Sequence, residues 1–431
     1  MKIAVIGAGV SGLSAAYLLA QAHDVTLFER EPRLGGHAHT HAVQDGARTL
    51  PVDTGFMVFN ERTYPNFIRL LARLGVASRP SDMSFSVRCR RCGLEFSSVG
   101  ARGLFAQPWR VADPRHLVML ADVLRFFRRG RRALADGTAA GQSLGEFLAR
   151  GRHTTALMRH FLLPMGGAIW SASSADMRAF PAESFLRFFD NHGLLAPAGQ
   201  PVWRTVVGGS QAYVGAIARA LDGRVQVAAP VRQVRRGATV VEVQLASGVR
   251  AMFDQVVMAT HADEALALLA DPSDAEREAL GAFRYSTNRT VLHTDGALLP
   301  AARAARASWN CDLADCRDEA SAVSVTYDLD RLQGHAATRP ILASLNSVVP
   351  IGGEVLAEMA YTHPILDGAA FAAQPRVARL NGQRRTFYCG AHLRYGFHED
   401  GVMSALAVTR AFGIDLDRVE PAAVARLRVT A

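Results

Sequence analysis

The first thirty residues contain two apolar runs separated by a glycine-rich turn and a helical pattern. An apolar run from Lys2 to Ile6 leads directly into a turn and then a helical pattern, and the turn reads Gly7-Ala8-Gly9-Val10-Ser11-Gly12. A second apolar run over 25–28 ends in Glu29. Strand, glycine turn, helix, strand and acid in this order form a dinucleotide-binding unit, with the pyrophosphate at the positive end of the helix dipole. A secretory signal or a phosphate-binding loop with a Lys-Ser/Thr pair does not predict this order.

Length and composition indicate an ordered enzyme. A chain of 431 residues with 49% hydrophobic content can form two or three units with sizeable cores. Five irregularly spaced cysteines indicate reduced thiols, and no apolar run is long enough to span a bilayer. We therefore expect a cytoplasmic protein. The sequence does not indicate an oligomeric state.

The net charge of +9 comes almost entirely from arginine, because Lys2 is the sole lysine. Arginines gather in the segment 125–132, at the end of an apolar helical run over 117–124. This pattern is typical of a helix that contacts anionic lipid at the inner leaflet, and equally of a core-facing helix with a solvated basic end. The basic residues do not form a nucleic-acid motif, so we expect no nucleic-acid partner.

Two groups of potential metal ligands stand out. Cys89 and Cys92 are separated by two arginines, and no second pair at zinc-ribbon spacing follows. We interpret them as flanking a hairpin turn, with a zinc site as the minor alternative. His37, His39 and His41 alternate and point the same way if extended, without a carboxylate to complete a site. They indicate a polar wall, and we predict no metal.

The chain alternates between α/β and helical regions. The apolar run 253–260 is typical of a buried parallel strand, and 384–413 indicates a strand, a glycine turn and a helix from about Gly401. We predict an α/β protein in which a nucleotide-binding domain combines residues 1–60, 201–265 and 375–431. Residues 61–200 and 266–374 would form an inserted α+β substrate domain.

Further glycines follow the acid-bearing strand and recur near the end of the chain. Gly35-Gly36-His37 and Thr54-Gly55-Phe56 allow close approach of a bulky cofactor, as does the late Gly390 turn. In this order the motifs resemble the flavin-containing amine oxidoreductase superfamily, which implies a glutathione-reductase-type FAD-binding Rossmann fold. The superfamily usually has arginine where this chain has His37, and an acid where it has Ala391-His392.

The resemblance implies FAD contacts along the whole chain. The pyrophosphate and ribose would be held by the opening turn and by Glu29 with Arg30. Val231 would contact the adenine through its backbone. The complete predicted set is Gly7, Gly9, Val10, Ser11, Gly12, Glu29, Arg30, Gly35, Gly36, His37, Thr54, Gly55, Phe56, Val231, Gly390, His392, Gly401 and Val402.

Longer motifs resemble one bacterial subfamily of predicted NAD/FAD-binding proteins. They include the stretches 51–60, 164–171, 187–195 and 395–401. This subfamily is similar to the flavin-dependent fatty acid desaturase of furan fatty acid biosynthesis, and more distantly to flavin-dependent fatty acid isomerases. The resemblance implies a fatty acyl or phospholipid substrate.

The residues narrow the chemistry further. A second glycine fingerprint for NAD(P)H is absent, so the substrate itself would reduce the flavin. Amine oxidases of the superfamily often hold a water at the flavin with a lysine, and Lys2 lies at the start of the first strand. The sequence thus favours desaturation of an unsaturated or methyl-branched acyl chain. A fatty acid isomerase, an amine or other small-molecule oxidase, and a flavin carrier without turnover stay as alternatives.

Desaturation removes a hydride and a proton, so a base is expected beside the cofactor. His398 precedes Gly401 closely and is the first candidate. Glu399 and His192 are further candidates. Each also has a structural interpretation: cofactor packing for His398, a helix N-terminal acid for Glu399 and a turn residue for His192.

Overall fold

The glycine turn lies at the carboxyl edge of a five-stranded parallel sheet in a computed structural model, which describes residues 1–320 and 323–417. The sheet order is β10-β2-β1-β14-β20, and every neighbouring pair is parallel. The strands are β1 (Lys2–Ile6), β2 (Asp24–Phe28), β10 (Val225–Gln226), β14 (Gln255–Met258) and β20 (Thr386–Tyr388). The last part of the predicted range 375–431 lies outside the described residues.

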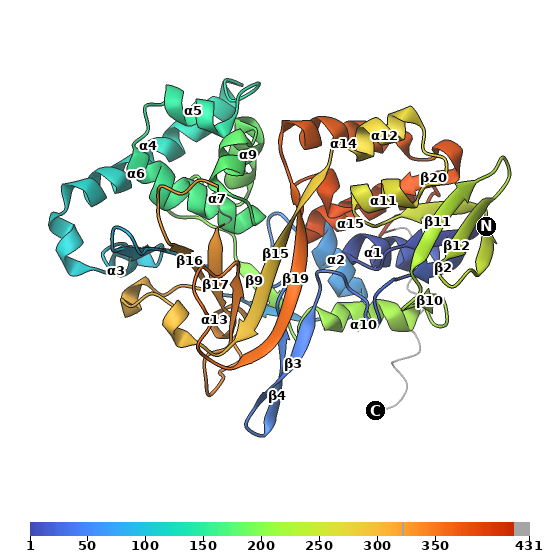
Figure 1. Cartoon of the computed structure of the whole chain (residues 1–431), viewed down its shortest axis with the longest axis horizontal. Helices are drawn as coiled ribbons and strands as arrows, with labels where there is room; N and C mark the ends of the chain where they lie inside the picture. Colours follow the sequence, from blue (N-terminus) through green and yellow to red (C-terminus); the bar gives the residue numbers. More distant parts are fainter. Residues whose placement is uncertain (321–322, 418–431) are drawn as a thin grey trace.

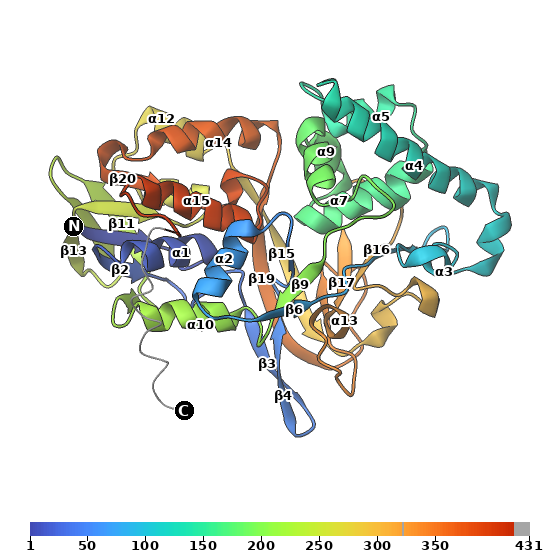
Figure 2. The same cartoon turned by 180° about the vertical axis from the view of Figure 1, so that it is seen from behind.

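Helices cover one face of this sheet and a small antiparallel sheet covers the other (Figures 1 and 2). Helix α1 packs between α15 and α10, and α2 contacts α15. Their bounds are α1 (Val10–Leu19), α2 (Pro65–Arg73), α10 (Gln211–Ala220) and α15 (His398–Arg410). The small sheet consists of β11 (Val231–Arg236), β12 (Val241–Leu245) and β13 (Arg250–Phe253). This arrangement confirms the predicted FAD-binding Rossmann fold. Helix α15 begins at His398, three residues before the predicted start.

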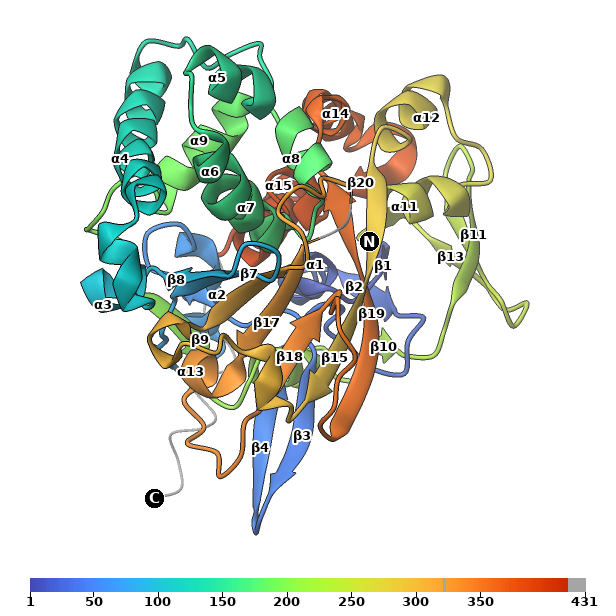
Figure 3. The same cartoon turned by 60° about the vertical axis from the view of Figure 1, so that its left-hand side comes forward.

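A second, seven-stranded sheet forms the rest of the scaffold (Figure 3). Its order is β19-β15-β18-β17-β16-β7-β8, and only β16 and β7 pair in parallel. The strands are β7 (Phe85–Cys89), β8 (Leu94–Ser97), β15 (Arg284–His293), β16 (Trp309–Leu313), β17 (Ser324–Asp328), β18 (Leu342–Leu345) and β19 (Val355–Ile365). Its strands come from both predicted inserts.

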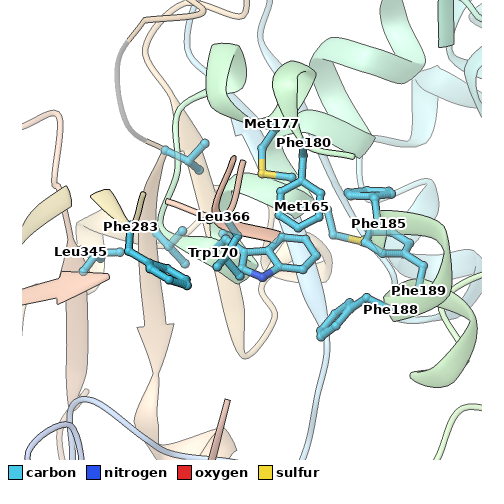
Figure 4. Close-up of a cluster of buried hydrophobic side chains, with 14 of the residues drawn as sticks. Met165, Trp170, Met177, Phe180, Phe185, Phe188, Phe189, Phe283, Leu345 and Leu366 are labelled. Carbon is cyan, nitrogen blue, oxygen red and sulfur yellow. The ribbon is translucent and has the colours of Figure 1, made fainter. Parts of the chain in front are cut away.

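A group of helices stands beside one end of the seven-stranded sheet (Figures 1 and 3). They are α4 (Pro114–Ala135), α5 (Leu144–Arg150), α6 (Thr155–Leu157), the π-helical turn η2 (Met158–Leu162), α7 (Leu163–Trp170), α8 (Ser174–Ala179) and α9 (Ala182–Asn191). Aromatic side chains form their core (Figure 4). The Trp170 ring lies 4.7 Å from those of Phe180 and Phe188. Burial of such rings is a large stabilising contribution.

Shorter elements join these parts. The hairpin β3 (Thr40–Asp45) and β4 (Arg48–Asp53) projects from the molecule, and β5 (Phe59–Asn60), β6 (Ser78–Pro80) and β9 (Trp203–Val206) form a small sheet. The remaining helices are α3 (Gly100–Leu104), α11 (Ala262–Leu268), α12 (Asp274–Leu280), α13 (Leu329–Gln333) and α14 (Gly368–Leu380). Within the described ranges, no helix is long and apolar enough to cross a bilayer.

Candidate active site

A cavity of about 1270 Å³ extends from the glycine turn to the seven-stranded sheet and the helices α7 and α9. Pockets for drug-sized ligands usually enclose roughly 300–1,000 Å³. The cavity is therefore large enough for an extended cofactor together with a substrate.

The three fingerprint glycines have different surroundings. A side chain at Gly12 would collide with the carbonyl oxygen of Gly7, so the missing Cβ lets α1 lie close to the sheet. Gly7 has φ +99°, which suits glycine. A Cβ at Gly9 would meet no protein atom within 4 Å and would enter the cavity that Gly9 lines. This open space beside the start of α1 is a cradle for a phosphate group.

The acid and the paired glycines close this end of the cavity. The Glu29 carboxylate accepts hydrogen bonds from the backbone N–H groups of Ala8 at 2.7 Å and Glu31 at 3.0 Å. Gly35 donates its N–H to the Ala8 carbonyl, and a Cβ at Gly36 would lie 3.2 Å from the Gly9 Cα. The two glycine segments are thus held against each other and both line the cavity.

His37 offers an unpaired ring nitrogen in the cavity wall. The Thr362 backbone favours the protonated form of the ring, but burial outweighs this effect. The Nε2 atom is buried and has no partner among the described residues. Burial holds the pKa of His37 well below its usual value, so the ring is neutral. Nε2 is therefore free to form a hydrogen bond with a bound cofactor.

The first base candidate, His398, lines the cavity and is rigidly held. Its ring stacks on Phe56 at 3.4 Å between centroids, and its Nε2 lies 3.0 Å from the Tyr213 hydroxyl. Burial lowers the pKa of His398 to about 3. The imidazole is therefore neutral at physiological pH and a weak base.

His192 also lines the cavity, but both ring nitrogens have protein partners. Nδ1 donates to the Phe188 carbonyl at 2.8 Å, which leaves Nε2 to accept from the Thr63 hydroxyl at 3.1 Å. Burial lowers the pKa of His192 to about 4. These contacts indicate a fixed wall residue.

Glu399 does not reach the cavity. Its carboxylate accepts from the backbone N–H groups of Asn66 and Phe67 and from the Asn66 side chain, at 2.6–3.1 Å. These donors lie in the first turn of α2, where a carboxylate is favoured by the helix dipole. The structure corrects the prediction: Glu399 is a cap of α2 and not a base candidate.

Most predicted cofactor contacts line the cavity, and four do not. A Cβ at Gly401 would lie 2.6 Å from Val10 Cγ1, because α15 crosses α1 closely at this point. Val402 is buried in the core next to it. Thr54 bonds the Tyr361 hydroxyl, and Gly12 faces the sheet. The predicted residues on the cavity surface are Gly7, Gly9, Val10, Ser11, Glu29, Arg30, Gly35, Gly36, His37, Gly55, Phe56, Val231, Gly390 and His392.

One wall of the cavity was not foreseen from the sequence. Tyr361 and His363 on β19 lie beside His37, with ring centroids 5.3 Å from it, and His261 stacks on Tyr285 at 4.4 Å. Burial lowers the pKa values of both His261 and His363. These residues lie on strands and loops without a motif. In the sequence, Tyr361 and His363 are separated by one residue, which places them on the same face of a strand. Such alternation is common in any sheet and does not indicate a site.

Comparison with known proteins agrees with this architecture. The model of the flavin containing amine oxidoreductase family matches residues 10–300. The fold and the glycine cradle agree with the FAD-binding fold of this family. The chain belongs to the flavin-containing amine oxidoreductase family.

Curated relatives match only short segments. Tryptophan 2-monooxygenase of Allorhizobium ampelinum is 43% identical over 77 residues, 17% of this chain and 10% of the relative. Zeta-carotene desaturase of Zea mays is 37% identical over 76 residues, 17% of this chain and 13% of the relative. The matches thus span about a tenth of these relatives' length.

Solved structures share the fold over nearly the whole chain. A CLA-producing fatty acid isomerase from P. acnes has a TM-score of 0.67 at 17% identity, covering 95% of this chain and 98% of that chain. Cyclohexylamine oxidase from Brevibacterium oxydans IH-35A has a TM-score of 0.64 at 16% identity, and the match covers 96% of this chain and 99% of that chain. At these identities the likeness extends to the fold alone.

The cavity fits FAD. The cradle at Gly9, the carboxylate of Glu29 and the unpaired Nε2 of His37 match the pyrophosphate, ribose hydroxyls and polar groups of this cofactor. Gly7, Gly9, Glu29, Gly35 and Gly36 would hold the adenosine diphosphate end.

Proposed function

We propose that the protein desaturates an unsaturated or methyl-branched fatty acyl chain of a membrane lipid. The apolar arm of the cavity supports this function. Beyond the glycine cradle the cavity is lined mainly by apolar and aromatic side chains: Met57, Val58, Met83, Phe85, Met165, Ala168, Ile169, Phe188, Leu194, Trp203, Trp309, Met359 and Phe397. Such a lining suits a long hydrocarbon chain.

The charges around the cavity favour an acyl chain over an amine. Among its described lining residues, the acids are Glu29, Glu31, Glu264 and Asp82. Glu29 caps backbone groups beside the cradle, and Glu264 bonds Arg30 at 2.7 Å. Asp82 accepts from the Ser308 hydroxyl. Glu31 pairs with Arg30 at 3.5 Å, and Asp82 also lies 3.7 Å from Arg331. Since each of these carboxylates already has a polar or charged partner, an ammonium ion in the apolar arm would lose its hydration with little to replace it.

The names of two similar proteins support an apolar, unsaturated substrate. One is the fatty acid isomerase whose fold this chain shares, and the other is the carotene desaturase that matches a short segment. The sole lysine, Lys2, does not line the cavity.

The reaction removes two hydrogens from neighbouring carbons and forms a double bond. Bound FAD would supply the acceptor for the hydride at N5. We assign the proton to Nδ1 of His398, which has no hydrogen-bond partner among the described residues, while Tyr213 and Phe56 fix the ring. Because His398 is a weak base, bond breaking led by hydride loss is favoured. Loss of the hydride leaves positive charge on the carbon that carried it, and a neighbouring double bond or methyl branch stabilises this charge.

Product analysis tests the proposal. The FAD-loaded protein is incubated with phospholipids that carry monounsaturated or methyl-branched chains and, separately, with primary amines. We expect an acyl product two hydrogens lighter and no reaction of the amines. A product of unchanged mass with a moved double bond would identify an isomerase. Amine oxidation with unchanged lipids would overturn the proposal.

Helix α4 and the turn before it offer a surface for lipid contact. Trp109 is 66% exposed, and Leu117, Val118 and Leu124 are also exposed on this side. Exposed Arg128, Arg131 and Arg132 follow on the last turns of α4. Of the predicted docking arginines, Arg125 and Arg129 instead bond Asp122 and the Phe147 carbonyl. We propose that the exposed side chains dock on an anionic membrane.

Vesicle pelleting tests this docking surface. Anionic vesicles should pellet the protein more than neutral ones, and replacing Arg128, Arg131 and Arg132 by Gln should remove the preference. Replacing Arg219, Arg232 and Arg235, which are exposed on other elements, by Gln is the charge-matched control and should keep it. Equal pelleting of both triple variants would contradict the assignment.

A further inference from the structure

Four potential metal ligands from three parts of the chain meet beside the β7–β8 hairpin. They are Cys89, Cys92, His160 and Cys316, and their ligand atoms all lie within 4.8 Å of one another. The Cys92 Sγ and His160 Nε2 atoms are 3.4 Å apart. Residues 1–320 and 323–417 contain one such group of three or more ligands.

The hairpin brings two of the cysteines together. Cys89 is the last residue of β7, and Gly93, with φ +68°, donates its N–H to the Cys89 carbonyl at 2.9 Å. The turn between them contains Cys92. Two cysteines spaced Cys-x-x-Cys around a tight turn can bind one ion.

The parallel pairing of β16 with β7 adds the third cysteine. Leu313, the last residue of β16, is aligned with Cys89, and its carbonyl accepts from the Arg90 N–H at 2.8 Å. The chain therefore leaves β16 beside the hairpin turn, and Cys316 follows three residues later. An ion pair between Arg91 and Asp315 at 3.0 Å braces the turn against this loop.

The fourth ligand comes from the helical part of the molecule. His160 lies in the π-helical turn η2, which contacts β7. Figure 3 shows β7 and β8 passing beneath α6 and α7, the helices on either side of η2. Single π-helical turns are rare and occur frequently at functional sites.

The chemistry of the group matches zinc. Three thiolates and one imidazole form a standard tetrahedral zinc set. Ligand atoms about 2.0–2.3 Å from one ion lie about 3.3–3.8 Å apart, so the observed spread needs only small side-chain movements. All five cysteines of the chain are free, so no disulfide withdraws a ligand.

We propose that Cys89, Cys92, Cys316 and His160 bind one structural zinc ion. Four protein ligands leave no open coordination position for a substrate or water. None of the four lines the flavin cavity. The site is therefore separate from the redox centre.

Its position suggests what the ion stabilises. Strand β7 begins at Phe85, which lines the apolar arm, and η2 leads directly into α7, whose Met165 and Ile169 line the same arm. The zinc ion would fasten these two walls to each other at their outer ends. Its loss should loosen the substrate arm and leave the glycine cradle intact.

Metal analysis of the purified holoprotein tests the proposal. We expect about one zinc per chain, and near zero in Cys92→Ser and Cys316→Ser. Cys311→Ser is the matched control, because Cys311 lies on β16 outside the group, and it should keep the metal. Cobalt substitution should give the absorption of a tetrahedral thiolate site at wavelengths beyond the oxidised flavin bands. The two zinc-free variants should melt at lower temperature and keep their FAD.

The cobalt spectrum of the wild type tests the proposed zinc site even if a variant fails to fold. Wild-type protein without zinc after growth with added zinc, and without a thiolate cobalt spectrum, would overturn the proposal. A disulfide between Cys89 and Cys92 found by mass spectrometry in such protein would identify a redox pair in place of a metal site.

Discussion

A substitution at Gly9 should weaken cofactor binding without affecting folding. Its φ of −70° is allowed for any residue, and a Cβ there would meet no protein atom. Gly9→Ala should therefore fold normally and place a methyl group where the pyrophosphate would pass. We expect the affinity for FAD to fall about tenfold or more, which is a loss of roughly 1.4 kcal/mol in binding free energy. The melting temperature of the apoprotein should stay close to that of the wild type.

Gly12→Ala is the contrasting variant. Its methyl group would collide with the Gly7 carbonyl oxygen, so it should lower the stability of the apoprotein itself. Calorimetry of both apoproteins together with fluorimetric FAD titration separates the two effects. Equal loss of stability in both variants would contradict the open cradle at Gly9.

Glu399 is expected to contribute to stability rather than to turnover. Glu399→Gln removes the charge from three hydrogen bonds at the start of α2 and should cost about 1–2 kcal/mol. Chemical denaturation measures this loss. Turnover per folded, FAD-loaded molecule should be unchanged, and a large loss of turnover at normal stability would return Glu399 to the catalytic candidates.

The crossing of helices α1 and α15 depends on one small residue. A Cβ at Gly401 would lie 2.6 Å from Val10 Cγ1 and 2.9 Å from Ser11 Oγ. Gly401→Ala should therefore separate the two helices and lower the free energy of unfolding by about 1–3 kcal/mol, measured without FAD. Normal apoprotein stability with lost FAD would instead support the direct cofactor contact predicted from the sequence.

Elements with local signals could be predicted from the sequence, and those that depend on packing could not. The β1–α1–β2 unit follows from glycine spacing and apolar runs, and β14 from its uninterrupted hydrophobicity. The start of α15 depends on Asp400, whose carboxylate accepts from the Phe397 N–H at 3.0 Å. The His261, Tyr361 and His363 wall depends on the pairing of β15 with β19, for example Ser286 with His363, which lie far apart in the sequence. No local pattern reports such pairing.

Buried neutral histidines make the stability of the protein sensitive to acid. His293 is fully buried. Its Nδ1 accepts from the Asp295 N–H, and its Nε2 lies 2.8 Å from the Ser344 hydroxyl. Burial lowers its pKa from 6.5 to about 4. Since a lowered folded-state pKa means that the unfolded chain binds the proton first, the stability that His293 contributes is present above pH 6.5 and lost toward pH 4.

His293→Asn should flatten this dependence. We expect the difference in the free energy of unfolding between wild type and variant to shrink by about 1–2 kcal/mol from pH 7 to pH 5. Burial raises the pKa values of Asp53 and Asp400 to about 6, which acts in the opposite direction, but both proteins share these groups. Denaturation curves at several pH values give the difference, and parallel curves would refute the assignment.

We expect an acyl chain in the apolar arm to reduce FAD held at the glycine cradle. Ala168 lines that arm and is nearly fully buried, far along the chain from the cradle residues. Ala168→Trp should therefore block the arm and leave the cofactor in place. The most direct measurement is the absorbance of the bound flavin after anaerobic addition of unsaturated phospholipid. We predict rapid bleaching of wild type, none in FAD-loaded Ala168→Trp, and none of either protein by amines. Bleaching of wild type by amines but not by lipid would show that the arm does not bind an acyl substrate.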